Sequence, residues 1–142
     1  MTSENMRFIE KTKQIDNLEE IVKAYDALED WKSKGFATAF ARSRADGDDV
    51  VVDMFWSNYW LRKAYITARL EPILIKLAFE AVRAGDLDDW FVEDINGVYG
   101  GDKVYRLLYS LNEYAPERFQ KSAAFCTVYE MCFGPLPTRK AA

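Results

Sequence analysis

The chain contains no histidine and only two cysteines, Cys126 and Cys132, among its 142 residues. Without histidine, neither a Ser-His-Asp nor a Cys-His nucleophile can be assembled, and no imidazole can serve as an acid, a base or a metal ligand. A zinc site built from cysteine and histidine needs four ligands, and two are present. The commonest catalytic and zinc-binding arrangements are therefore excluded, and we expect a protein without catalytic residues or cofactors.

Long apolar runs are also missing. No uninterrupted apolar stretch reaches the roughly 18 residues of a membrane span, and the first residues lack the basic and apolar segments of a secretory signal. If Cys126 and Cys132 share a helix, they lie about 9 Å apart along its axis, which is too far for a disulfide. Both are therefore expected to be reduced thiols in a cytoplasmic protein.

The composition is that of a folded protein. Apolar residues make up 49% of the chain and aromatic residues 15%, which is enough to build one sizeable core. The net charge of -4 disfavours a general nucleic-acid binder, because such proteins are normally basic. We expect a single helical domain over residues 1–142, with 1–14 frayed and 134–142 a C-terminal tail.

Helical periodicity runs through the first third of the chain. Asn17 and Glu20 have the spacing of a capping box, and apolar residues recur after them every three or four positions. Gly35 is expected to end this helix. The segment 36–41 then forms a short helical turn with Phe36 and Phe40 on one face.

The longest helix is expected over residues 50–83. The β-branched run at 50–52 is also compatible with a strand, but Asp48 and Asp49 can cap a helix there. Pro72 predicts a kink or a break near Leu70–Glu71. Because 61–82 is apolar around most of its circumference, other helices should surround it.

Three further segments are helical. Asp86 can cap a helix over 87–95, and Asp102 can cap the next. Pro116 suits the first turn of a final helix, which Gly134 stops. The sequence therefore predicts an all-α fold: a compact irregular bundle of six or seven helices around a long, Pro-kinked central helix.

A row of cations lies on the central helix. Its members are spaced by seven residues and fall within about 60° of one another on the helix: Arg62, Arg69, Lys76 and Arg83. Such a row can bind phosphates or nucleic acid. Alternatively it is the solvated edge of a buried helix, and Glu80, which can pair with Lys76, favours this interpretation.

An acidic patch follows the central helix: Asp86, Asp88, Asp89, Glu93 and Asp94 lie within nine residues that contain no cation. On a helix, Asp86, Asp89 and Glu93 would share one face, and Asp89 with Glu93 could hold Mg²⁺ in a metal-dependent nucleotide or phosphate hydrolase. Alternatively, the patch complements a helix dipole and attracts a basic target.

Aromatic residues are too crowded to face one core, because neighbours in the sequence point in different directions. Aromatic side chains are enriched at the anchoring centres of protein interfaces. The residues that we expect at an interface are Trp56, Tyr59, Trp60, Trp90, Tyr99, Tyr105, Tyr109 and Tyr114.

The function that these features favour is a non-enzymatic intracellular domain that docks on another protein. Inhibitor, immunity-like and phage-type accessory proteins have this size and composition. Self-association through the aromatic residues is one alternative for the partner. Metal-dependent hydrolysis at Asp86, Asp89 and Glu93, and nucleic-acid binding through the row from Arg62 to Arg83, are alternatives for the activity.

Overall fold

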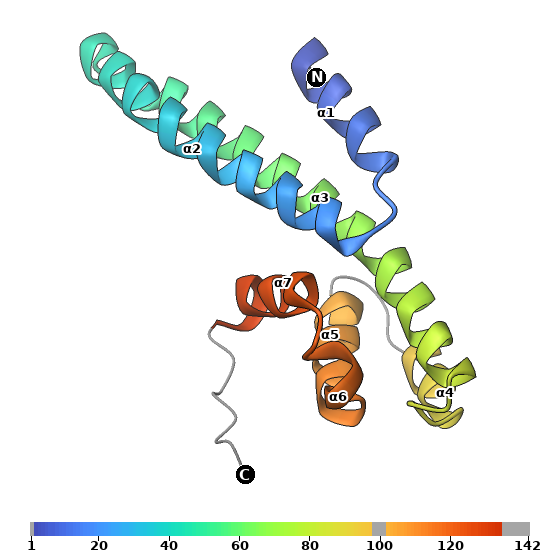
Figure 1. Ribbon diagram of the computed structural model, residues 1–142. Helices are drawn as coiled ribbons and strands as arrows, with labels where there is room; N and C mark the ends of the chain where they lie inside the picture. Colours follow the sequence, from blue (N-terminus) through green and yellow to red (C-terminus); the bar gives the residue numbers. More distant parts are fainter. Residues whose placement is uncertain (1, 98–101, 135–142) are drawn as a thin grey trace. The chain divides into compact units, whose positions relative to one another are not determined.

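The computed structural model describes residues 2–97 and 102–134, and every regular element among them is an α-helix (Figure 1). The all-α prediction is therefore confirmed, as is the helix at 50–52. The helices are α1 (Ser3–Lys13), α2 (Leu18–Asp46), α3 (Val50–Arg83), α4 (Trp90–Asn96), α5 (Asp102–Tyr114), α6 (Pro116–Phe119) and α7 (Ala123–Phe133).

The chain divides into two compact units that share α2 and α3. Unit 1 combines Met1–Asp16 with Lys23–Arg69, and unit 2 combines Asn17–Val22 with Leu70–Ala142. Unit 1 therefore holds α1, most of α2 and the first part of α3. Unit 2 holds the rest of α3 and all the shorter helices that follow. A single folding domain stays a prediction.

In unit 1, α2 and α3 form an antiparallel hairpin (Figure 1). The hydroxyl groups of Tyr25 and Thr67 are hydrogen-bonded at 2.9 Å, while the rings of Trp31 and Phe55 stack at 4.7 Å nearer the connecting turn. The turn itself contains Gly47 at a φ of 74°. Contacts between residues far apart in sequence thus follow from two long helices joined by a short turn.

The first turn of α3 is capped from two sides. The Asp48 carboxylate accepts a hydrogen bond from the Val50 amide at 3.1 Å, and the buried Ser43 hydroxyl accepts one from the Val52 amide at 3.0 Å. These bonds satisfy amides that have no partner within the helix. The β-branched run at 50–52 is compatible with a strand or a helix, and the two caps stabilise the helix.

Gly35 does not end a helix, contrary to the sequence-based expectation. α2 continues past it to Asp46 and includes Phe36 and Phe40. A Cβ atom at position 35 would lie 2.8 Å from Cε2 of Phe55, so glycine is needed for the close approach of that ring. Glycine in a helix costs about 1 kcal/mol relative to alanine, and ring packing against α3 offsets that cost.

α1 packs on α3 through polar groups. The Asn5 side-chain amide donates to the Asn58 side-chain oxygen at 2.9 Å, and the Arg62 guanidinium donates to the Asn5 side-chain oxygen at 3.0 Å. Arg69 donates to the backbone carbonyl of Ile15, just beyond the end of α1. α1 thus lies within the segment 1–14, for which fraying was expected, and these bonds hold it in unit 1.

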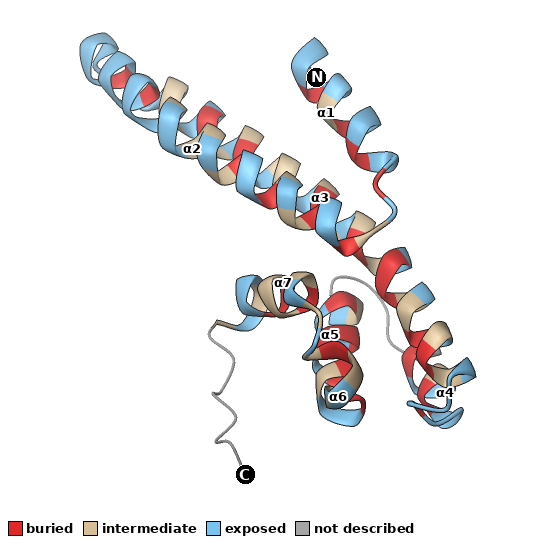
Figure 2. Ribbon diagram, in the orientation of Figure 1, coloured by how far each residue is buried: buried red, intermediate tan, exposed pale blue. Residues whose placement is uncertain are grey.

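Unit 2 has an apolar core. Val104, Leu107 and Leu111 are buried along the inner face of α5, at helical spacing. Figure 2 shows buried residues on each of the helices around it. The fully buried large side chains of unit 2 are Ile21, Leu70, Leu74, Phe91, Leu107, Leu108, Leu111, Phe125 and Val128.

Two helix boundaries in unit 2 differ from those expected. α4 begins at Trp90 and not at 87, because the Asp86 carboxylate binds Arg118 at 2.9 Å and caps no helix. The final helix is two helices, since the Ser122 hydroxyl accepts a hydrogen bond from the Phe125 amide and starts α7 anew. Pro116 does begin α6, as predicted.

Pro72 lies inside α3. The sequence predicted either a kink or a break near this proline, and the helix continues through it without a break. Proline lacks the N–H that would bind the carbonyl of residue 68. Both Pro72 and Ala68 are exposed, so water can reach that carbonyl. The cost of the missing bond is therefore reduced, and packing of the buried face keeps α3 continuous.

Candidate functional site

Five aromatic side chains of unit 1 form a continuous row across α2 and α3, which we call the aromatic strip. The ring centroids are 6.0 Å apart for Phe40 and Phe36, and 5.4 Å apart for Phe36 and Trp56. The row continues from Trp56 to Tyr59 at 5.7 Å and on to Trp60 at 5.2 Å. The sequence pointed to the three members on α3, while Phe36 and Phe40 were missed.

The members of the strip differ in exposure. Phe36, Phe40 and Trp60 are 37%, 46% and 58% exposed, and Trp56 is half-buried. Tyr59 is only 4% exposed, which corrects its assignment to a surface. Its ring packs beneath its neighbours because the inner face of α3 turns it toward α2. The strip thus has one buried ring and a partly exposed row around it.

Cations stand over several of these rings. The Arg44 guanidinium lies 5.5 Å from the ring centre of Phe40, and the Lys63 ammonium lies 5.2 Å from that of Trp60. Attraction between a cation and a ring of this kind contributes about 0.5–1 kcal/mol at an exposed site. Nucleic-acid bases would have to displace these cations in order to stack on the same faces.

Tyr59 is fixed by a polar contact at its outer end. Its hydroxyl donates to the Glu29 carboxylate at 2.5 Å, and Lys32 pairs with the same carboxylate at 2.5 Å. Burial, together with the Glu29 bond, raises the pKa of Tyr59 to about 12. Lys32 and Tyr59 lower the pKa of Glu29. Near neutral pH the phenol therefore stays protonated, and the contact is structural.

The strip and α1 lie on different sides of α3. α1 contacts Asn58, which is two residues from Trp60 and therefore about 160° from it around the helix. From Phe40 to Met54, around the turn of the hairpin, Ser43 alone is buried. The end of the hairpin therefore leaves large apolar side chains in solvent.

The described aromatic residues expected at an interface in unit 2 are also exposed. Trp90 contacts Tyr114 at 5.3 Å, and Tyr105 contacts Phe133 at 5.6 Å. Tyr109 is 50% exposed on the outer face of α5. Tyr99 lies outside the described residues. Unit 2 also holds a row of rings, from Phe119 through Phe125, Tyr129 and Phe133 to Tyr105, but only the last two are exposed.

The basic row is divided between two uses. The Arg62 guanidinium lies 4.6 Å from the ring centre of Trp31 and also bonds Asn5, and Arg69 binds the Ile15 carbonyl. These two cations hold unit 1 together. Lys76 and Arg83 are exposed on the part of α3 that belongs to unit 2. The two arginines of the basic row that belong to unit 1 are therefore engaged within the fold.

The acidic patch does not form the expected helical face. Asp86 and Asp89 precede α4, and Glu93 lies within it. Asp86 pairs with Arg118 at 2.9 Å, and Asp94 pairs with Arg106 at 3.5 Å. Over residues 2–97 and 102–134, no group of three or more carboxylates and thiols is arranged to hold a metal ion.

Neither Cys126 nor Cys132 forms a disulfide with another described residue, and burial raises the pKa of the Cys126 thiol, which lowers its reactivity. Within the described part of the chain, no helix is long and apolar enough to cross a membrane.

No protein-family model, curated protein or solved structure matches the chain. Its function is therefore inferred from its own residues.

Proposed function

We propose that the chain is a non-enzymatic protein-binding domain that docks on another protein through the aromatic strip. The observation that carries the proposal is the exposure of Phe36, Phe40 and Trp60 within one continuous row of rings. Large aromatic anchors give much contact area and lose little conformational freedom on binding. The row is held in place by Tyr59 and by the stack of Phe55 on Trp31.

Charges of both signs border the strip. Arg44 and Lys63 stand over its outer rings, while exposed Asp49 and Asp53 precede Trp56 on the same side of α3, at spacings of three and four residues. A polar, mixed-charge rim around aromatic anchors is typical of protein interfaces, and it selects the orientation of the partner. An inhibitor, immunity-like or accessory role fits a domain that works by covering a surface of its target.

The alternatives receive less support. Nucleic-acid binding through the basic row would require Arg62 and Arg69, which are engaged in unit 1. Metal-dependent hydrolysis would require Asp86, Asp89 and Glu93 to converge, and Asp86 instead pairs with Arg118. Docking through the aromatic strip uses rings that are already partly exposed.

Photo-crosslinking in the native host tests the proposal. A photoreactive amino acid is placed at Phe40 or Trp60, and at Lys34 as a matched control. Lys34 is exposed on α2, two residues from Phe36 and about 160° around the helix. We expect positions 40 and 60 to yield the same crosslinked partner and position 34 to yield none. Equal yields from all three positions, or no product from any, would contradict the proposal.

A second variant measures how much the strip contributes. With the photoreactive residue at position 40, Trp60→Ala should lower the crosslinking yield at a limiting partner concentration. Loss of an aromatic anchor costs about 2 kcal/mol, which corresponds to roughly 30-fold in affinity. A product of twice the mass of the chain would identify the partner as a second copy, and an unchanged yield would exclude Trp60 from the interface.

A further inference from the structure

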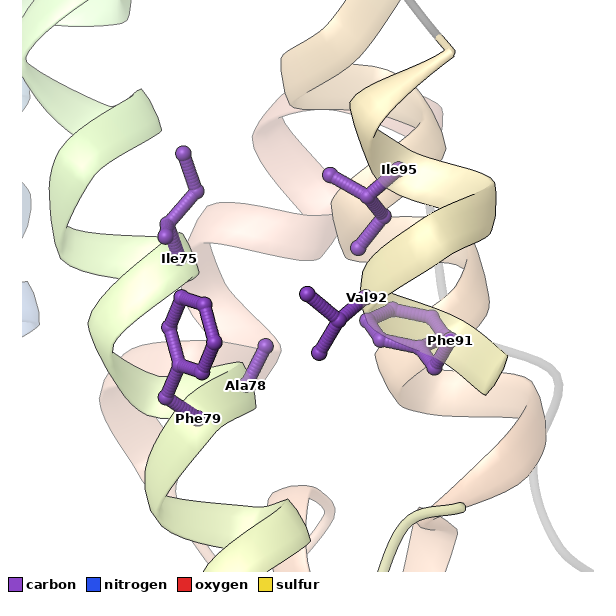
Figure 3. A pocket seen from close by; sticks show the side chains of 6 residues that line it. All are labelled: Ile75, Ala78, Phe79, Phe91, Val92 and Ile95. Atoms are coloured by element: carbon purple, nitrogen blue, oxygen red, sulfur yellow. The ribbon is translucent and has the colours of Figure 1, made fainter. Parts of the chain in front are cut away.

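We propose that unit 2 carries a second docking site, in which a pocket between α3 and α4 receives an apolar side chain from a basic segment of a partner. Ile75, Ala78 and Phe79 line the pocket from α3, and Phe91, Val92 and Ile95 line it from α4 (Figure 3). All six side chains are apolar. The site lies in unit 2 and goes beyond docking through the aromatic strip.

The pocket follows from the spacing of its residues. Ile75, Ala78 and Phe79 lie three and four positions apart on one side of α3, and Phe91 and Ile95 are one turn apart on α4. Ala78, Phe91 and Ile95 are buried, while Ile75 and Val92 are half-buried and Phe79 is 44% exposed. The buried residues therefore form the floor, and the exposed ones form the walls of an opening to solvent.

The size and lining of the pocket restrict its occupant. Its volume is about 30 Å³, so it has room for only a small group. Water gains little there because all six lining side chains are apolar. The end of one aliphatic side chain, such as leucine or isoleucine, fits both the volume and the lining.

Carboxylates border the pocket on α4. Asp89 lies one turn before Val92, whose amide binds the Asp89 carbonyl at 3.2 Å, and Glu93 follows Val92 directly. Both side chains are exposed, and no ion pair joins either to another residue of the described ranges. Asp86 and Asp94 are paired with arginines. Asp89 and Glu93 are thus the charges that remain for a partner.

The opposite border, on α3, carries Lys76 and Arg83, with Glu80 within one turn of each. The three carboxylates of Asp88, Asp89 and Glu93 outnumber these two cations, so the rim of the pocket is negative. A partner segment with an aliphatic anchor and lysine or arginine one turn to either side complements this rim. The apolar anchor supplies specificity for the pocket, and the cations supply long-range attraction.

Peptide binding to the full-length chain tests this site. The probe is a fluorescent amphipathic helical peptide with leucine on one face and lysine on the other, and its matched control carries glutamate in place of lysine. Binding is followed by fluorescence anisotropy. We expect the lysine peptide to bind about tenfold more tightly or better, and its affinity to fall as salt is raised. Equal binding of the two peptides would overturn the proposal.

Protein variants locate the binding. Asp89→Asn with Glu93→Gln should weaken binding of the lysine peptide about tenfold, because it removes two exposed charge interactions with the peptide. Val92→Gln, which makes the wall of the pocket polar without adding charge, should weaken it similarly. Circular dichroism confirms that each variant is folded.

The control removes two carboxylates of unit 1 by Asp46→Asn with Asp48→Asn, and it should leave the affinity unchanged. Equal weakening by both double variants would show general attraction to an acidic protein and would overturn the proposal. An unchanged affinity in Val92→Gln would do the same. Trp60→Ala should not affect the peptide, so failure of this site is distinguishable from failure of the aromatic strip.

Discussion

The two units are stabilised by different kinds of contact. Of the eleven largest fully buried side chains in the described residues, unit 1 contributes only Leu28 and Ile66, and unit 2 contributes nine. Unit 1 instead buries the polar residues Asn5, Thr12 and Ser43, each with a hydrogen bond. Unit 2 is therefore stabilised mainly by apolar burial, whereas unit 1 combines polar hydrogen bonds with rings that are partly exposed.

This difference has a functional side. An aromatic ring that is half in solvent contributes less to folding than a buried one, since the hydrophobic gain scales with the area removed from water. The exposed rings of unit 1 therefore retain area that a partner can cover. Unit 2 buries more of its large apolar side chains in its own core, and its exposed rings, such as Trp90 and Tyr109, lie outside that core.

The largest expected effect is in the core of unit 2. Phe125→Ala should lower the free energy of unfolding by about 3–5 kcal/mol, because it removes a fully buried ring and leaves a cavity. Urea denaturation followed by circular dichroism measures the change. Met131→Ala, at a 40% exposed position of the same helix, is the control and should cost less than about 1 kcal/mol. Similar losses of unfolding free energy in the two variants would contradict stabilisation of unit 2 by apolar burial.

A smaller effect is expected at the helix crossing of unit 1. Gly35→Ala gains about 1 kcal/mol of helix propensity but brings a Cβ atom to 2.8 Å from Cε2 of Phe55. The ring of Phe55 stacks on Trp31 and has little room to move, so overpacking should prevail and lower the unfolding free energy by about 1–2 kcal/mol. Thermal unfolding measures it. Phe55→Leu in the same chain should relieve part of the loss, and a stabilised Gly35→Ala variant would contradict close packing here.

The smallest effect concerns the Glu29 ion pair of unit 1. Glu29→Gln keeps an acceptor for Tyr59 but loses the charge interaction with Lys32, which should cost at most about 1 kcal/mol at this solvent-exposed carboxylate. The bonds from Lys32 and Tyr59 hold the folded-state pKa of Glu29 below the ordinary glutamate value of 4.5. Its contribution is therefore present above pH 4.5 and is lost as pH falls through the folded-state pKa.

Melting temperatures of wild type and Glu29→Gln test this pH dependence. Wild type should melt higher at neutral pH, and the gap should close well below pH 4.5. A gap that persists in acid would mean that the Glu29 charge does not stabilise unit 1.

Much of the fold was predictable because it depends on local chemistry. Helical periodicity, the Asn17 cap and the Pro116 start are properties of a few neighbouring residues, and each is confirmed. Gly35 was misjudged because its role depends on Phe55, which lies twenty residues away in sequence and beside it in space. The start of α4 was misplaced because the partner of Asp86 is Arg118. Such long-range contacts leave no periodic signal.

The aromatic strip was predictable in part for the same reason. Crowding on α3 indicated that its aromatic residues could not all face one core; Trp60 is exposed, Trp56 is half-buried and Tyr59 is buried. Phe36 and Phe40 have helical spacing, but only the antiparallel hairpin brings them to Trp56. Tyr59 was placed at the surface because its buried contact with Glu29 joins two helices. The sequence does place Glu29 and Tyr59 on separate helices, where a carboxylate can accept a hydrogen bond from a phenol once the helices pack together.

The most direct test of the strip as a docking surface is one measurement on the double variant Phe40→Ala/Trp60→Ala: crosslinking to the partner from a photoreactive residue at position 36, with urea unfolding of the same sample as its control. Both rings are about half exposed, so the unfolding free energy should stay within about 1 kcal/mol of wild type while crosslinking falls to the level of position 34. Crosslinking that persists in the folded double variant would contradict docking through the aromatic strip.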